Sequence, residues 1–182
     1  MTVSLCTKPK VATMLGLPDA YCELEKHFRN KKESWANNGP VVSGHLDIRN
    51  LDGPLVIPLS EAESINLAQS CKIELPNLRI IAPGFLNLVG ASDISFPVMK
   101  KVEGYISARY SNDIKFQIME QVSWHVDVRS THAITFNKLT EIHGDLDARQ
   151  AADLDLPSLT IVHGNVLVSN TEQLSMPRLK RI

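Results

Sequence analysis

Aspartate and arginine recur together in this sequence at a spacing that allows them to form ion pairs. Arginine follows aspartate by two residues in three places, and a further arginine falls at the same point of the repeat described below. Residues two apart in a strand point to the same side of a sheet, so each pair would lie on one face. The residues concerned are Asp47, Asp127, Asp147, Arg49, Arg109, Arg129 and Arg149. Such charges either compensate one another or contact a charged partner.

Two histidines form a second set that could do chemistry. His143 and His163 each precede a glycine and occupy equivalent places, and Asp145 is close to the first of them. Two imidazoles and a carboxylate could hold a metal, but catalytic zinc usually has three protein ligands and only two are evident here. We therefore expect solvent-exposed turn histidines, no metal site and no cofactor.

Catalytic groups of other kinds are not recognisable. Asp127 and Asp147 are the adjacent acids of one face, and the arginine beyond each would lower their pKa values, which does not suit a general acid. The sequence shows no glycine-rich phosphate loop, nucleophile elbow or Cys/His pair. We expect a protein that is not an enzyme. A carbohydrate-active β-helix enzyme is an alternative, because such enzymes place clustered carboxylates in a groove.

A twenty-residue repeat that runs without gaps from Gly84 to Ile182 must position these side chains. Its opening residues are Gly84, Gly104, Trp124, Gly144 and Gly164. Apolar residues recur behind them, for example Ile94, Ile114, Ile134, Leu154 and Leu174, then Phe96, Phe116, Phe136, Leu156 and Met176. Repeats of this length bury their apolar face by stacking on copies of themselves.

Each unit contains two predicted strands. Alternating apolar residues such as Ile106 and Ala108 indicate a first strand with one buried face, and a polar turn follows it. A second strand of the type Ile94-Ser-Phe96 then ends at a proline, which cannot donate to the ladder. We expect glycine at the corner to avoid crowding, so at Trp124 either the corner differs or the indole lies outside.

The same pattern extends back to residue 41 with irregularities, and residues 60–64 are expected to form a loop or a short helical turn. The predicted fold is mainly β: a right-handed parallel β-solenoid of about seven coils, with about 20 residues and a rise of roughly 4.8 Å each. It covers residues 41–182.

Three segments carry a family resemblance. PNLRIIAPGFLNL (76–88), PVMKKVEGYISA (97–108) and PSLTIVHGNVLV (157–168) follow the pattern P-x-L-x-x-I-x-G-x-L-x-I. This pattern is similar to the repeats of receptor L domains and related leucine-rich-repeat β-solenoids. The resemblance implies a right-handed solenoid of short parallel strands that serves as a recognition surface. This chain differs from the receptor versions because no signal peptide or paired cysteines are evident.

Residues 1–40 are expected to form an N-terminal helical cap. Pro18 and Asp19 suit the first turn of a helix over 18–37, and Gly39-Pro40 ends it. An amphipathic helix there would cover the first open coil of a solenoid. The alternative is a DNA-binding regulator that uses a helix-turn-helix within residues 10–30, although acids in its recognition helix would repel phosphate.

The bulk composition favours a soluble protein of a reducing compartment. Lysine and arginine number 19 against 20 acidic residues, which gives no general attraction to nucleic acid or to a membrane. The three cysteines form no disulfide framework. No apolar run is long enough to span a bilayer, and no targeting segment is recognisable. We expect a cytoplasmic protein, in a bacterial or a host cell.

Equivalent outward residues of successive coils should stack into columns, and one column reads Phe85, Tyr105, His125, Asp145. Beside it run the aspartates and arginines named above. Aromatic residues and arginine favour interfaces, so this face is the candidate binding surface. We expect an intracellular bacterial or phage-type protein that binds or inhibits another protein, with a cell-surface recognition module as the alternative. A homodimer through the last coil is also expected, because an open coil exposes edges that invite pairing.

Overall fold

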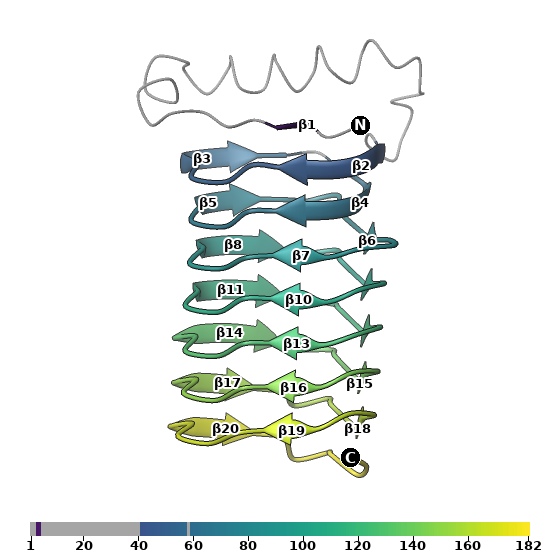
Figure 1. Ribbon diagram of the computed structural model, residues 1–182, viewed down its shortest axis with the longest axis vertical. Coiled ribbons are helices and arrows are strands. Elements are labelled where there is room, and N and C mark those ends of the chain that lie inside the picture. Colours follow the sequence, from purple (N-terminus) through teal and green to yellow (C-terminus); the bar gives the residue numbers. More distant parts are fainter. Residues whose placement is uncertain (1–2, 5–40, 58) are drawn as a thin grey trace.

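The protein folds as a parallel β-solenoid of about six turns (Figure 1). The computed structural model describes residues 3–4, 41–57 and 59–182. Seven strands stacked in one sheet correspond to the expected seven coils, with six turns of chain between the first and the last. The expected helix over 18–37 and the alternative helix-turn-helix over 10–30 lie outside the described residues.

Three strand faces enclose the core. The front face is formed by β2 (Val41–Asp47), β4 (Glu61–Asn66), β7 (Leu86–Asn87), β10 (Ile106–Ser107), β13 (Val126–Asp127), β16 (Leu146–Asp147) and β19 (Val166–Leu167). The back face is formed by β3 (Asp52–Val56), β5 (Cys71–Glu74), β8 (Ser92–Phe96), β11 (Asn112–Phe116), β14 (Ala133–Phe136), β17 (Asp153–Asp155) and β20 (Gln173–Ser175). All neighbouring strands run parallel, as the repeat predicts.

The short-strand face was not predicted as strand. It consists of β6 (Ile80–Ile81), β9 (Lys101–Val102), β12 (Gln121–Val122), β15 (Glu141–Ile142) and β18 (Ile161–Val162). The segment 60–64 was expected to be irregular, and this expectation is wrong. Glu61 and Ala62 pair with β6, and β4 continues from there onto the front face, so one strand joins two faces. The buried residues of this strand include Ala62 and Ser64. Because both are small, the sequence shows no alternating apolar pattern here.

Strand β1 (Val3–Ser4) pairs in parallel with β2, so the ladder continues beyond the first coil. At the other end Ile161 forms an isolated parallel bridge with Arg181. None of the residues that the structure describes forms a helix that could cross a membrane.

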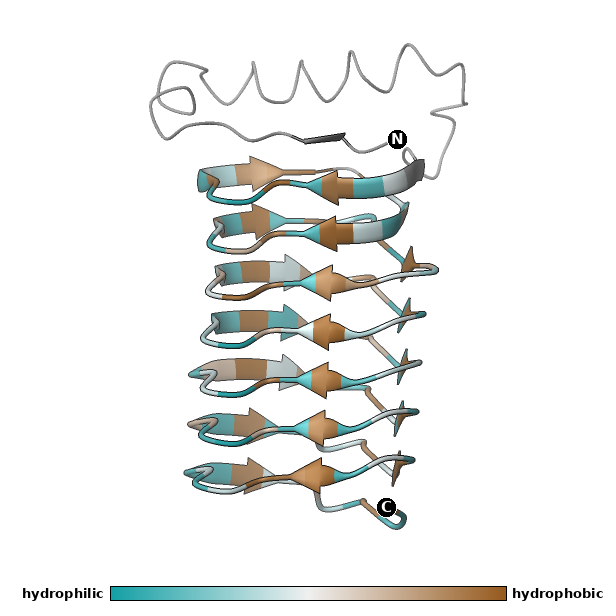
Figure 2. Cartoon of the chain, viewed as in Figure 1, coloured by the Kyte–Doolittle hydropathy of each residue, from teal (hydrophilic) through white to brown (hydrophobic). Residues whose placement is uncertain are grey.

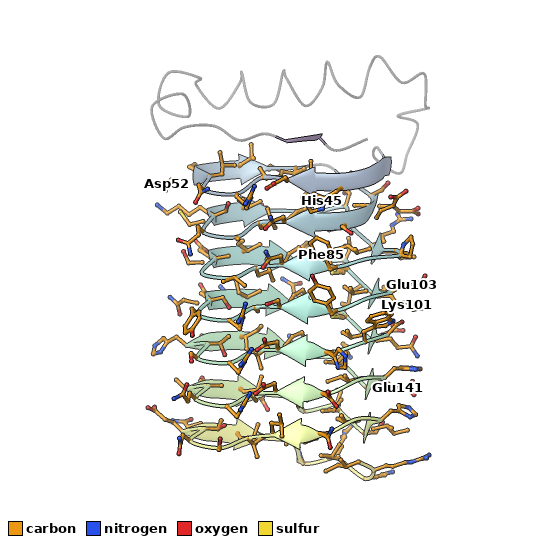
Figure 3. The ribbon with its side chains drawn as sticks, viewed as in Figure 1. His45, Asp52, Phe85, Lys101, Glu103 and Glu141 are labelled. Carbon is orange, nitrogen blue, oxygen red and sulfur yellow. The ribbon has the colours of Figure 1, made fainter. Side chains whose placement is uncertain are left out.

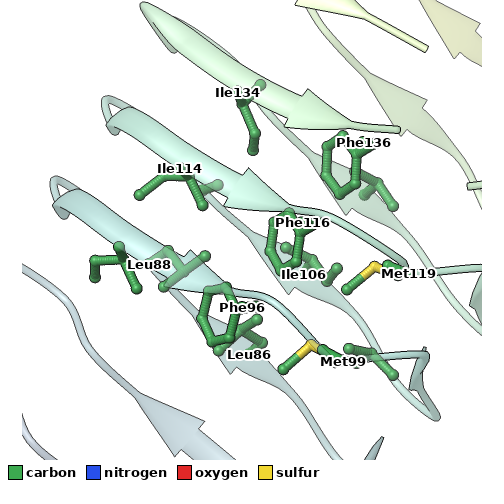
Figure 4. Packing of buried hydrophobic residues seen from close by; sticks show 14 of the residues in the cluster. Leu86, Leu88, Phe96, Met99, Ile106, Ile114, Phe116, Met119, Ile134 and Phe136 are labelled. Carbon is green, nitrogen blue, oxygen red and sulfur yellow. The ribbon is translucent and has the colours of Figure 1, made fainter. Parts of the chain in front are cut away.

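The core is a stack of similar layers, in which equivalent apolar residues of successive coils lie over one another. Phe96, Phe116 and Phe136 are fully buried, and their ring centroids are 4.8 Å apart with interplanar angles of 4° and 6° (Figure 4). Figure 2 shows the matching hydropathy pattern, with apolar residues at equivalent points of successive strands. Because each buried side chain packs on its counterparts, the core fixes the register of the whole surface.

One backbone conformation recurs in every coil at the turn between the front and back faces. Glycine, asparagine, glutamine, serine and tyrosine occupy this left-handed position. The residues, with their φ angles, are Asn50 (59°), Gln69 (60°), Gly90 (67°), Tyr110 (59°), Ser130 (53°), Gln150 (61°) and Asn170 (58°). Glycine and asparagine tolerate this conformation, whereas a tyrosine is held there by its neighbours.

Candidate binding surface

The in-register ladder brings the predicted surface residues onto the front face. Ser107 pairs with Asp127, and Asp127 pairs with Asp147, so these outward side chains stack on successive coils. Phe85, Tyr105 and His125 each lie directly before a front-face strand. They are two residues before Asn87, Ser107 and Asp127, respectively. The structure therefore places all eight predicted residues on one face, namely Phe85, Tyr105, His125, Asp127, Asp147, Arg109, Arg129 and Arg149.

The aromatic column is a stack of rings. Phe85 and Tyr105 lie nearly parallel, with centroids 5.3 Å apart and an interplanar angle of 13°. The other side of Phe85 meets His45, 5.1 Å away and tilted by 44°. Ser64 lies between these two coils, and its small side chain accepts a hydrogen bond from the Phe85 backbone N–H at 3.3 Å. Both faces of the Phe85 ring are thus covered by other rings.

A surface pocket of about 260 Å³ adjoins this column at the corner between the short-strand and front faces. The indole of Trp124 lies outside the core, as one of the two sequence-based alternatives requires, and it is 59% exposed. Figure 3 shows Phe85 on the front face and Glu103 with Lys101 at the neighbouring edge. The lining is mostly apolar and consists of Pro83, Gly84, Phe85, Glu103, Gly104, Tyr105 and Trp124.

Glycines form the floor of the pocket because the coils approach each other closely there. A methyl group on Gly104 would collide with the carbonyl of Gly84, and one on Gly84 would collide with the carbonyl of Glu63. The backbone N–H of Trp124 donates to the carbonyl of Gly104 at 3.0 Å, so the tryptophan coil keeps the same ladder. The Trp124 side chain therefore lies beside Gly84 and Gly104, which have no side chains.

The aspartates and arginines form an ion ladder along the front face. Arg129 donates to both carboxylate oxygens of Asp127, at 2.9 and 2.8 Å, and Arg149 donates to Asp147 at 2.9 and 2.7 Å. Arg129 also lies 3.4 Å from Asp147 in the next coil. Each carboxylate is therefore shared between two guanidinium groups, as expected for charge compensation.

These contacts shift the protonation equilibria of the ladder. Hydrogen bonds from Arg149 hold the pKa of Asp147 below its usual range, against the opposing effect of burial. The hydrogen bond to Asp127 raises the pKa of Arg129, and that to Asp147 raises the pKa of Arg149. The lowered pKa of Asp147 does not suit a general acid.

Arg109 has the weakest pairing of these three arginines. Serine, not aspartate, stands two residues before it, so its own coil offers no carboxylate at that place. Its Nε is 3.6 Å from Asp127, too far for a hydrogen bond, and has no hydrogen-bond partner among the described residues. Three guanidinium groups thus share two carboxylates from Arg109 to Arg149, which leaves one positive charge beside the aromatic column.

His125 ends the aromatic column with a hydrogen bond to the next coil. Its Nδ1 accepts a hydrogen bond from the backbone N–H of Asp145 at 2.9 Å. Oδ2 of Asp145 lies 3.3 Å from the same Nδ1. Because that nitrogen already accepts a hydrogen bond from the backbone, its approach to Asp145 is not counted as a second hydrogen bond. Asp145 itself accepts from the backbone of Asn165 at 2.7 Å, a bond that lowers its pKa.

The two predicted turn histidines are exposed and close together, with centroids 4.9 Å apart. Sequence reasoning missed their third neighbour. Oε1 of Glu141 lies 2.8 Å from Nε2 of His163 and 3.4 Å from Nε2 of His143. Asp145, the acid considered from the sequence, is not part of this group.

The pocket was also missed, although part of its signal was visible. Among the five units from Gly84 onward, Trp124 alone replaces the corner glycine, which marks a bulky exposed side chain beside the aromatic column. Glu103 and Pro83 gave no sequence signal, because they join the pocket through the corner between two faces.

No protein-family model, curated protein or solved structure matched this chain.

Proposed function

We propose that this solenoid is a non-enzymatic binding protein that docks another protein on its front face. The observation that carries the proposal is the apolar pocket beside Tyr105 and Trp124, directly adjacent to a rigid ladder of arginines and aspartates. Interface hot spots combine aromatic side chains and arginine in this way. An intracellular interaction or inhibitor protein is the form that the sequence favours, and an extracellular recognition module would use the same face.

The orientation of the rings favours protein over carbohydrate or nucleic acid. A sugar or a base stacks on a free ring face, but Phe85 has both faces covered, by Tyr105 and His45. The arginines that would bind phosphate are mostly compensated by aspartate. The exposed side chains of Tyr105 and Trp124 border a small apolar pocket, which suits an aliphatic or aromatic side chain of a protein.

The surface also specifies the chemistry of the partner. Tyr105 and Arg109 are four residues apart along one coil, which separates them by about 13 Å in an extended strand. The pocket would take an apolar anchor residue, and the incompletely paired guanidinium of Arg109 would take a carboxylate. We therefore expect a segment that carries an apolar residue and an acidic residue about four positions apart.

Selection from a phage-displayed library of random twelve-residue peptides tests this proposal. The full chain is the bait, and the Trp124→Gly variant serves for counter-selection. This variant is a matched control, because glycine occupies the same place in four other coils. Enriched peptides should combine an apolar and an acidic residue, and they should bind at least about tenfold more weakly to Tyr105→Ala and to Arg109→Gln.

Tyr110→Asn is the matched surface control, since this tyrosine is 67% exposed and does not line the pocket. Its binding should equal that of the unmodified protein. Peptides that bind Trp124→Gly and Arg109→Gln equally well would refute the front-face proposal. Selective binding to a glycan or to duplex DNA that is lost in the same variants would show that the partner is a carbohydrate or a nucleic acid and not a protein.

A further inference from the structure

The group of Glu141, His143 and His163 lies on the coils that follow the aromatic pocket. Glu141 belongs to β15, and the two histidines follow β15 and β18 at the same corner of the solenoid. Figure 3 labels Glu141 along the edge that also carries Glu103. The candidate ligand atoms of the three residues all lie within 4.8 Å of one another. Two coils therefore contribute to one compact group of nitrogen and oxygen donors.

We propose that Glu141, His143 and His163 bind a divalent transition-metal ion, for which Zn²⁺ is the reference. Zinc bonds to imidazole nitrogen and carboxylate oxygen are about 2.0–2.2 Å long, so ligand atoms around a tetrahedral ion lie about 3.3 Å apart. The carboxylate oxygen is 2.8 Å from one imidazole nitrogen and 3.4 Å from the other. Only small rotations of exposed side chains separate this arrangement from coordination.

The glutamate is already oriented for this role. Gln121, in the preceding coil, donates from Nε2 to Oε2 of Glu141 at 3.1 Å, which leaves Oε1 facing the two histidines. Polar groups behind the direct ligands commonly fix ligand orientation and strengthen metal binding.

The chemistry of the donors selects the class of metal. Two imidazoles and one carboxylate suit Zn²⁺, Co²⁺, Ni²⁺ or Cu²⁺, whereas Mg²⁺ and Ca²⁺ prefer all-oxygen sites. Three protein ligands leave a fourth position for water or for a group on a partner. Since the ligands come from two coils, the ion would also tie these coils together and stabilise the folded state.

Metal titration of the full chain tests the proposal. After treatment with chelator, the protein is titrated with ZnCl₂ by isothermal titration calorimetry, and its melting temperature is measured with and without Zn²⁺. Replacing Zn²⁺ by Co²⁺ should give visible d–d absorption with the intensity of a four- or five-coordinate site. Mg²⁺ and Ca²⁺ should leave the melting temperature unchanged.

Variants distinguish this group from other metal-binding side chains of the chain. The double variant His143→Gln/His163→Gln should lose one zinc equivalent and the Co²⁺ band, and Gln121→Leu should weaken binding by roughly tenfold. His132→Gln, an exposed histidine on another turn, should behave like the unmodified protein. Unchanged zinc stoichiometry and affinity in the double variant would overturn the proposal, as would the absence of any binding.

Discussion

Nε of Arg129 lies 3.4 Å from Oδ2 of Asp147 in the next coil, while the same guanidinium holds Asp127 of its own coil in two hydrogen bonds. The charge pairs therefore connect successive coils as well as residues within a coil. A ladder of this kind links successive coils and keeps the front face nearly neutral. In the proposed binding function, this would lower the cost of presenting the adjacent apolar pocket.

The ladder should make stability depend on acid pH. The pKa of Asp147 is lower in the folded state than in the unfolded chain, where it is about 3.9. Its stabilising effect is complete above that unfolded value and is lost as the pH falls through the folded value. Urea unfolding at pH 7, 4 and 2.5 should show a smaller fall in stability for Asp147→Asn than for the unmodified protein.

The exposed Asp153 on β17 provides the comparison for this pH series. Asp153→Asn should lose stability below pH 4 to the same extent as the unmodified protein. If Asp147→Asn follows that same curve, the ladder makes no contribution to acid stability.

The buried phenylalanine stack should be the most sensitive part of the core. Phe116 is fully buried between Phe96 and Phe136, so Phe116→Ala should cost about 3–5 kcal/mol of unfolding free energy. Phe116→Leu should cost less than about 2 kcal/mol, because leucine fills the same place at Leu156. Chemical denaturation measures both values. Lys115→Ala, one residue away and facing outward, is the control, and an equal loss there would contradict the core assignment.

The corner glycines should be irreplaceable where coils meet most closely. Gly104→Ala introduces a methyl group that collides with the carbonyl of Gly84, and we expect a loss of about 1–3 kcal/mol. Trp124→Gly, at the equivalent corner, should leave the far-ultraviolet circular dichroism spectrum unchanged. Thermal unfolding of the two variants measures these effects. If Gly104→Ala is as stable as the unmodified protein, the backbone at this corner can move apart to accommodate a methyl group.

The left-handed turn position predicts a stabilising substitution. Tyr110 has a φ of 59° and is exposed, whereas Asn50 and Asn170 occupy the same position in other coils. Asparagine adopts this conformation at lower cost, so Tyr110→Asn should raise stability by about 0.5–1 kcal/mol. Differential scanning calorimetry should show a melting temperature about 1–4 °C higher. A lower melting temperature would mean that the tyrosine ring makes stabilising contacts.

The repeat predicted the strands of the front and back faces but not those of the short-strand face, and the reason is physical. Alternation at Ile106 and Ala108 is visible because a strand with one buried face needs it. On the short-strand face only one residue of each strand is buried, such as Val102 in Lys101–Val102, so the sequence shows no alternation there. The segment around Ala62 was predicted to be a loop or a helical turn, because its inward residues are small and one of them is polar. Packing against the next coil, not local preference, makes these segments extended.

The candidate surface was predicted in part for a similar reason. Columns such as Phe85 and Tyr105 follow from one register, since equivalent residues of successive coils must stack. The pocket is lined by residues of neighbouring columns on both sides of a corner, where the Trp124 side chain lies beside glycines. No single sequence spacing predicts this combination. Glu141 meets His163 at a separation of 22 residues, outside the repeat of 20, so spacing alone pointed to the histidines and not to their third neighbour.

The hydrogen bonds of the three strand faces run along the axis of the solenoid, from each coil to the next. A pulling force along that axis would load the coils in series, so they should separate one at a time, as a zipper opens. Each coil of 20 residues would release roughly 70 Å of chain. In an atomic force microscope, this protein should give an evenly spaced ladder of small, low-force steps. A docked partner that spans several coils would merge some of those steps into one.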